Sequence, residues 1–268
     1  MFVLLSSLLS IAVLGSLFYL SQKRENRYMQ KYQILSTLRE VVHLTRQHRS
    51  AAHLSLLYKQ PHSSEIKHIQ EEVLLRCQML IDLTAIDSKP LYRILLNQYT
   101  FLFNNWQENS VAKSQFHHGK LIRHTLYLID EVTVSWLAES ERDELSDEYH
   151  GHWQIVIESL EALTQLRISI QDIQDEQGLT RFRHNAERMV RRLNQLALIS
   201  PLSIASPAGM EITRALEAYA ESAEYRPIKT ELYELTNQIS AAIFTSYDAM
   251  LDEIIESVYL PLPKLSIA

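Results

Sequence analysis

Hydrophobic residues recur at helical spacing along almost the whole chain. The clearest stripe lies in residues 33–56, where these side chains fall on one side of a helix: Ile34, Leu35, Leu38, Val41, Val42, Thr45, Ala52 and Leu56. Similar stripes, bounded by proline, glycine and polar residues, predict helices over 25–59, 64–86, 90–106, 112–139, 150–177, 180–198, 210–223 and 227–259. The pattern therefore predicts an all-α protein.

An acidic stretch, residues 140–149, divides these helices into two groups of four. We predict that it is a solvated connection or a frayed helix end. The expected organisation is a first four-helix half over 25–139, a second over 150–260 and a tail over 261–268, with Gly178 ending the fifth helix. Each half is expected to form an antiparallel four-helix bundle.

The N-terminal stretch differs from the rest because residues 2–20 are apolar or small and carry no charge. Such a run is just long enough to span a bilayer, so residues 1–22 are predicted to be a transmembrane anchor. A cleaved signal peptide is less favoured, since no basic residue precedes the run. Lys23, Arg24 and Arg27 follow it, and the positive-inside rule then places the soluble domain in the cytoplasm of a single-pass inner-membrane protein.

Two arginines interrupt the apolar stripes. Arg49 lies about 20° from Leu38 on a helical wheel, and Arg167 lies about 20° from Leu160. Arg46 lies on the flank of the first stripe. A guanidinium pointing into a helical core costs several kcal/mol unless something anionic meets it.

Two interpretations of these arginines remain open. Each stem could pack while its head reaches solvent or pairs with an internal carboxylate. Alternatively, arginines from different helices could clamp one small oxyanion, because the planar guanidinium offers paired donors and stays charged at any pH. On the second interpretation the predicted anion-binding residues are Arg46, Arg49 and Arg167.

Composition removes several other classes of function. Only five glycines are present, too few and too scattered for a Gly-rich phosphate loop. The net charge of −6 argues against a nucleic-acid partner. No catalytic motif is found, and the single cysteine, Cys77, lies at core spacing. A metal-dependent hydrolase built around His150 is a third and weaker hypothesis. Because no catalytic motif supports it, we expect no enzyme activity, no metal and no cofactor.

The segment Leu44-Thr45-Arg46-Gln47-His48-Arg49-Ser50 resembles the motif on the first helix of nitrate- and nitrite-sensing (NIT) domains, approximately L-Q-x-E-R-G. Arg49 matches the arginine of the motif, while His48 and Ser50 replace its acidic residue and its glycine. The inward pattern of residues 116–132 is also similar to this family. The resemblance implies two helical bundles that hold nitrate or nitrite between arginines and regulate an output module.

The leading hypothesis is a membrane-anchored helical sensor that binds a small oxyanion such as nitrate or nitrite. No output domain follows in the sequence, so the domain is expected to signal through an unidentified partner protein, and a homodimer is compatible with the pattern. The alternative is a ligand-free helical scaffold that binds other proteins at the membrane.

Overall fold

The computed structural model describes residues 2–59, 64–200, 206–221 and 228–265, apart from the side chains of residues 2–5, 143 and 221. Within these ranges the secondary structure is helical throughout, so the predicted all-α class is confirmed. The α-helices are α1 Phe2–Tyr58, α2 Ser64–Leu83, α3 Lys89–Asn105, α4 Val111–Glu139, α5 Asp143–Ser169, α6 Glu176–Ile199, α8 Pro207–Glu221 and α9 Lys229–Val258. Three short 3-10 turns join some of them: η1 Ile86–Ser88, η2 Trp106–Glu108 and η3 Ile170–Asp172.

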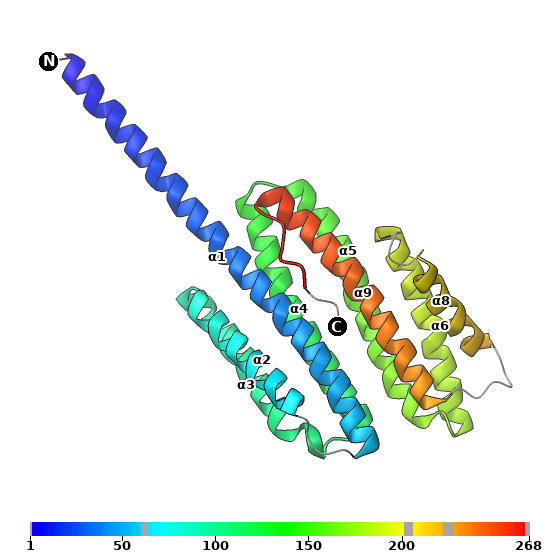
Figure 1. The fold of residues 1–268 in the computed structure, drawn as a ribbon. Helices are drawn as coiled ribbons and strands as arrows, with labels where there is room; N and C mark the ends of the chain where they lie inside the picture. The colour runs from blue at the N-terminus through cyan, green and yellow to red at the C-terminus, as the bar shows by residue number, and fades with distance from the viewer. Residues whose placement is uncertain (1, 60–63, 201–205, 222–227, 266–268) are drawn as a thin grey trace.

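The helices are arranged side by side (Figure 1). In the first group α1 packs against α2 and α4, and α3 contacts both α2 and α4. In the second group α5 packs against α6 and α9, and α8 contacts both α6 and α9. The two groups meet where α4 packs against α5.

The core of the first group contains the apolar side chains of α1 that the sequence predicted to be buried. Leu35, Leu38 and Val41 are fully buried on α1, as are Leu126 and Trp136 on α4. The start of α4 is fixed locally, because the Ser110 hydroxyl accepts a hydrogen bond from the backbone N–H of Lys113 at 3.2 Å. Local capping and apolar spacing thus explain why this helix begins within one residue of the expected position.

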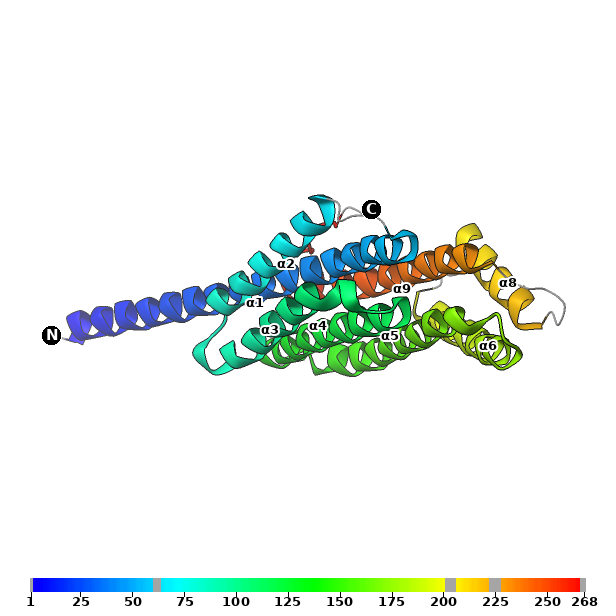
Figure 2. The same cartoon turned by 90° about the horizontal axis from the view of Figure 1, so that it is seen from below.

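Helix α1 is longer than the helix expected from the sequence, because residues 2–24 continue it without a break. This N-terminal part extends well beyond the other helices (Figures 1 and 2). Its apolar side chains are exposed, for example Leu9 at 68% and Phe18 at 73%. Within the described residues, no helix of the structure is long and apolar enough to cross a membrane, and the expected transmembrane span is therefore not supported. The first side chains of that span, those of residues 2–5, lie outside the described part.

The acidic stretch was predicted to be a solvated connection or a frayed helix end over 140–149. It is helical from Asp143 onward as the start of α5, so only residues 140–142 connect α4 and α5. Tyr149 is fully buried and Leu145 packs against the core, at the same i, i+4 spacing as Trp153. The apolar stripe of α5 therefore begins inside the acidic stretch. Charged residues occupy the other faces of α5 over residues 143–149, so the apolar stripe is hard to recognise in the sequence.

Gly178 does not end the fifth helix, as its position in the sequence suggested. Helix α5 ends at Ser169, and Gly178 lies in the first turn of α6. The chain turns between them while burying Ile170 and Ile173, and the Asp175 carboxylate caps α6 by accepting from the Gly178 N–H at 2.6 Å. The backbone at Gly178 lies so close to the backbone of Asp172 that a side chain would not fit between them. The glycine is therefore required by this contact and not by the end of a helix.

The tail that follows α9 lies across α1 and α9. The Tyr32 hydroxyl donates to the Pro261 carbonyl at 2.7 Å, and Arg39 donates to the Pro263 carbonyl at 3.1 Å. Leu262 is buried, and its N–H donates to the Asp252 carboxylate at 2.6 Å. Residues 262–265 line a cavity between α1 and α9.

Candidate functional site

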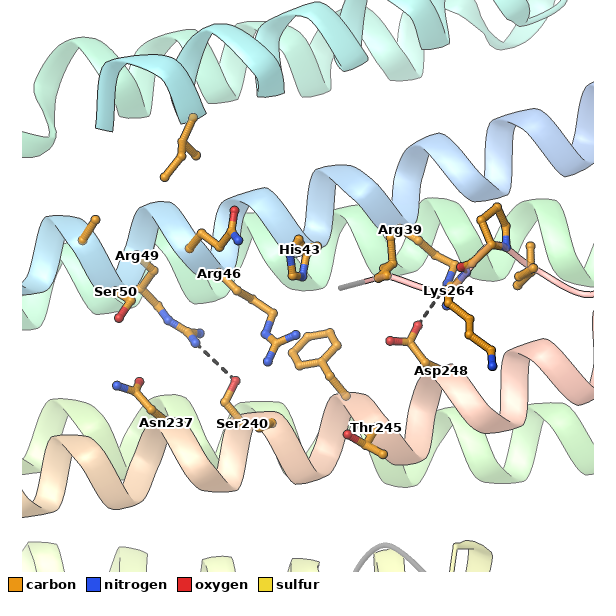
Figure 3. Close-up of a pocket in the computed structure, with 18 of the residues that line it drawn as sticks. Arg39, His43, Arg46, Arg49, Ser50, Asn237, Ser240, Thr245, Asp248 and Lys264 are labelled. Atoms are coloured by element: carbon orange, nitrogen blue, oxygen red, sulfur yellow. Dashed lines mark hydrogen bonds and ion pairs between the residues drawn. The ribbon is translucent and has the colours of Figure 1, made fainter. Parts of the chain in front are cut away.

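A cavity of about 860 Å³ lies between α1 and α9. Arg39, His43, Arg46 and Arg49 face it from successive turns of α1, and Asn237, Ser240, Phe244 and Asp248 face it from α9. The first turns of α2 and the tail residues 262–265 complete its wall. Figure 3 shows the side chains of Arg46 and Arg49 extending from α1 toward α9.

Arg49 is buried, with 6% of its surface exposed. Its Nη2 atom donates a hydrogen bond to the Ser240 hydroxyl of α9 at 3.2 Å (Figure 3). Burial lowers the pKa of Arg49 well below its ordinary value, and the charges of Arg167 and Arg46 lower it further. The side chain is therefore held in place by a neutral partner while its positive charge lies near two others.

Arg46 is less deeply buried and lies over an aromatic ring. Its guanidinium carbon is 4.2 Å from the centroid of the Phe244 ring. Its buried Nε–H has no hydrogen-bond partner within the described residues. Burial lowers the pKa of Arg46 to about 10, an effect that the charge of Asp248 partly offsets. An unused, buried donor in a cavity wall is available to an incoming acceptor.

Arg167, the third predicted residue, does not line the cavity. From α5 it donates to the Thr236 hydroxyl at 3.1 Å, to the Thr236 carbonyl at 2.9 Å and to the Asn237 side-chain oxygen at 3.2 Å. Burial lowers its pKa to about 9, and the charge of Arg46 contributes. Arg167 therefore lies behind the wall and orients Asn237, which does face the cavity.

These three arginines share one electrostatic feature: among the described residues, none has a carboxylate within ion-pair distance. Among the ion pairs of the described residues, none includes Arg46, Arg49 or Arg167. Arg39 in the same cavity does have one, with its Nε 3.0 Å from the Asp248 carboxylate. For the described part of the chain, the interpretation that Arg49 pairs with an internal carboxylate is therefore not supported.

The contribution of α9 to the cavity was not predicted from the sequence. Asn237, Ser240, Phe244 and Asp248 follow each other at i, i+3, i+7 and i+11, which places them on one face. That spacing was available as a signal. It was obscured because α9 also carries a long apolar line that includes Leu232, Ile239 and Ile243.

A second polar cluster is buried in the first group of helices. Because the Ser114 carbonyl can only accept, His118 Nδ1 must carry the proton of their 2.7 Å hydrogen bond. His118 Nε2 then accepts from His48 Nδ1 at 2.8 Å, and His48 Nε2 accepts from the Gln70 amide nitrogen at 2.9 Å. Both rings are neutral, since burial lowers the pKa of His48 to about 4 and that of His118 far below its ordinary value.

The weaker metal hypothesis gains no support from the structure. Among the residues that it describes, no three histidine, cysteine or acidic side chains come together in a way that could hold a metal ion. His150 instead stacks against the ring of Trp153, with 6.3 Å between their centroids. Cys77 is fully buried, and burial raises the pKa of its thiol to about 12. It is therefore an unreactive packing residue.

The geometry defines an all-helical fold with a cavity between two long helices, in which Arg46 and Arg49 face the opposite helix. No family model, curated protein or solved structure matches this chain. The resemblance to nitrate- and nitrite-sensing domains therefore continues to rest on the motif around Arg49 and on the pattern of residues 116–132.

Proposed function

We propose that this protein is a helical sensor domain that binds a small oxyanion of the nitrate or nitrite type between α1 and α9. One observation carries the proposal: Arg46 and Arg49 face a common cavity and have no carboxylate partner among the described ion pairs. Burying like charges together is unfavourable, and an anion between them would remove that cost. Asn237 and Ser240 would supply neutral hydrogen-bonding groups from the opposite helix.

The same arrangement suggests how binding could be transmitted. Arg46 and Arg49 belong to α1, while Ser240 and Asn237 belong to α9, so a bound anion would favour one relative position of the two helices. We infer that the two helix groups are two antiparallel four-helix bundles that share this cavity. Because α1 continues beyond the other helices, a shift of α1 could be sensed by an output protein bound there (Figure 2).

Replacing Arg49 with methionine tests the proposal. Arg49→Met removes an unpaired buried charge and keeps most of the volume, so the unliganded variant should be as stable as the parent or more stable by about 1 kcal/mol. The parent should gain roughly 2.7 kcal/mol at 100 times the dissociation constant of nitrate or nitrite, and Arg49→Met should lose this gain. Melting temperatures with nitrate, nitrite, sulfate, phosphate and chloride measure both effects.

The matched control is Arg93→Met, which removes an exposed arginine on α3 and should keep the parental response to anions. The proposal would be wrong if Arg49→Met kept the parental response to every anion. A loss of several kcal/mol without ligand would instead indicate that Arg49 neutralises a carboxylate.

The membrane attachment remains a sequence-based prediction, and the exposed apolar side chains between Leu8 and Leu20 motivate it. The full chain is expected in the membrane fraction after alkaline extraction, and a chain lacking residues 1–22 in the soluble fraction. A reporter fused after Ala268 should be active in the cytoplasm. Alkaline phosphatase activity from that fusion in the periplasm would contradict the predicted orientation.

The alternative function is a ligand-free scaffold that binds other proteins at the membrane. The same exposed apolar surface favours it, since large exposed apolar patches mark interaction sites. No response of the melting temperature to any anion, together with stable capture of a partner that depends on residues 6–20, would favour this alternative.

A further inference from the structure

The cavity between α1 and α9 is much larger than a trigonal oxyanion. At about 30 Å³ per water molecule in the liquid, a four-atom anion fills only a small part of it. The volume of about 860 Å³ lies within the range of roughly 300–1,000 Å³ that is typical of pockets for organic ligands. The size of the cavity therefore indicates a ligand with a body attached to its anionic group.

The positive charge is concentrated at one place in the cavity. Arg46 and Arg49 are one turn apart on α1 and face Ser240 and Asn237 of α9 (Figure 3). The other cationic side chain of α1 in the wall, Arg39, is already paired with Asp248. An anionic group would therefore be bound at the Arg46 and Arg49 end.

Apolar side chains also line the cavity. Phe244 and Ile69 are buried in the protein and contribute to the lining, and Leu54 lines the cavity while keeping 51% of its surface exposed. The protein covers only about half of the Leu54 side chain. This leucine is well placed to contact the apolar part of a ligand.

The overall charge of the lining limits the charge of the ligand. Arg39, Arg46, Arg49 and Lys264 are balanced by four carboxylates, those of Glu65, Glu234, Asp248 and Asp252. Two of these carboxylates are occupied, Asp248 by Arg39 and Asp252 by the Leu262 N–H. Because the positive and negative side chains of the lining balance, a ligand with one negative charge meets less repulsion from these carboxylates than a dianion or trianion would, and Arg46 and Arg49 form no ion pair among the described residues.

We infer that the ligand of this cavity is an organic monocarboxylate with an apolar body. Its carboxylate binds Arg46 and Arg49, and its body lies against Phe244, Ile69 and Leu54. This inference rests on the proposed function, because it uses the same anion site and changes the class of ligand.

The test measures melting temperature and binding heat of the full chain with benzoate, hexanoate, acetate, nitrate and the neutral benzyl alcohol. Benzoate and hexanoate should bind at least about tenfold more tightly than acetate or nitrate, since each buried methylene adds to affinity. Benzyl alcohol should give no shift, because it lacks the charge that the arginines recognise. Arg46→Met should lose all anion binding.

Leu54→Ser tests the contribution of the apolar body of the ligand to binding separately from that of its anionic group. It changes an exposed position, so the unliganded protein should melt as the parent does, while hexanoate binding should weaken by roughly three- to tenfold and nitrate binding should stay unchanged. Leu198→Ser on α6, where the leucine is 80% exposed and outside the cavity, is the matched control and should change neither.

The outcomes distinguish this inference from the proposed function. Nitrate binding as tight as every organic anion would overturn the inference and leave the oxyanion sensor in place. Benzyl alcohol binding as tightly as benzoate would also overturn it, since recognition would then be apolar alone. No response to any anion would overturn both.

Discussion

Lowering the pH from about 6.5 to about 4 is expected to remove several kcal/mol from the free energy of unfolding, because His48 and His118 are buried as neutral rings. The pKa of His48 falls from 6.5 to about 4 in the folded protein. At about 1.36 kcal/mol per pKa unit, this difference corresponds to roughly 3 kcal/mol for His48 alone. His118 shifts in the same direction, as does His53, whose pKa is also about 4.

The free energy of unfolding falls with the pH because the unfolded state binds protons at a higher pH than the folded state does. The folded-state pKa values lie below those of the unfolded chain, so the unfolded state takes up protons as the pH falls below 6.5. The contribution of the neutral histidines to the free energy of unfolding is therefore fully present above pH 6.5 and is lost progressively as the pH falls to about 4. A charged His48 would also carry a proton on Nε2, which could then no longer accept the hydrogen bond from the Gln70 amide nitrogen.

Denaturant unfolding at intervals from pH 7 to pH 4 measures this effect. The double variant His48→Gln, His118→Gln should show a shallower pH dependence than the parent, whereas His184→Gln, at an exposed position of α6, should follow the parent. Equal slopes for parent and double variant would contradict the prediction. If the double variant does not fold, NMR titration of both rings in the parent gives the same test, with the His48 ring expected to stay neutral at pH 5.

Gly178→Ala is expected to destabilise the protein by about 3 kcal/mol or more, as severe overpacking does. A Cβ atom on Gly178 would overlap the carbonyl oxygen of Asp172 and would lie 2.5 Å from its carbonyl carbon. Both atoms belong to the backbone of the turn between α5 and α6, so no rotation of a side chain relieves the clash. The turn itself would have to open, which would disturb buried Ile170 and Ile173.

Gly151→Ala is the matched control, since a Cβ atom there meets nothing within 4 Å. It lies inside α5, where alanine is the better helix former, and should stabilise the protein by about 0.5–1 kcal/mol. The melting temperatures of the two variants therefore distinguish destabilisation by the clash at Gly178 from stabilisation by the higher helix propensity of alanine. Similar melting temperatures for both would show that the turn adapts and that Gly178 has no steric role.

Much of the helical architecture was determined by local sequence. The positions of Leu35, Leu38 and Val42 at helical spacing predicted the buried face of α1, and all three are buried. The apolar spacing of residues 112–139 predicted the start of α4 within one residue, and the structure adds the Ser110 cap that fixes it. These features are local, because a cap and an amphipathic stripe are set by residues within a few turns of each other.

The same reasoning failed where the local signal was mixed. The acidic residues of 143–149 concealed the stripe of Leu145 and Tyr149, so the first two turns of α5 were missed. The sequence predicts Gly178 to be a helix terminator, because helices very commonly end at a glycine. Its actual constraint comes from the Asp172 backbone, a contact that no local pattern encodes.

For the candidate site, the sequence alone identified Arg49 and Arg167 as charged residues on buried faces, and both are buried. Only the tertiary structure decided what surrounds them. It pairs Arg39 with Asp248, gives Arg49 the neutral Ser240, and places Arg167 behind Asn237. The physical reason is that a helical wheel fixes the direction of a side chain relative to its own axis. The partner it meets depends on how α1, α5 and α9 pack together.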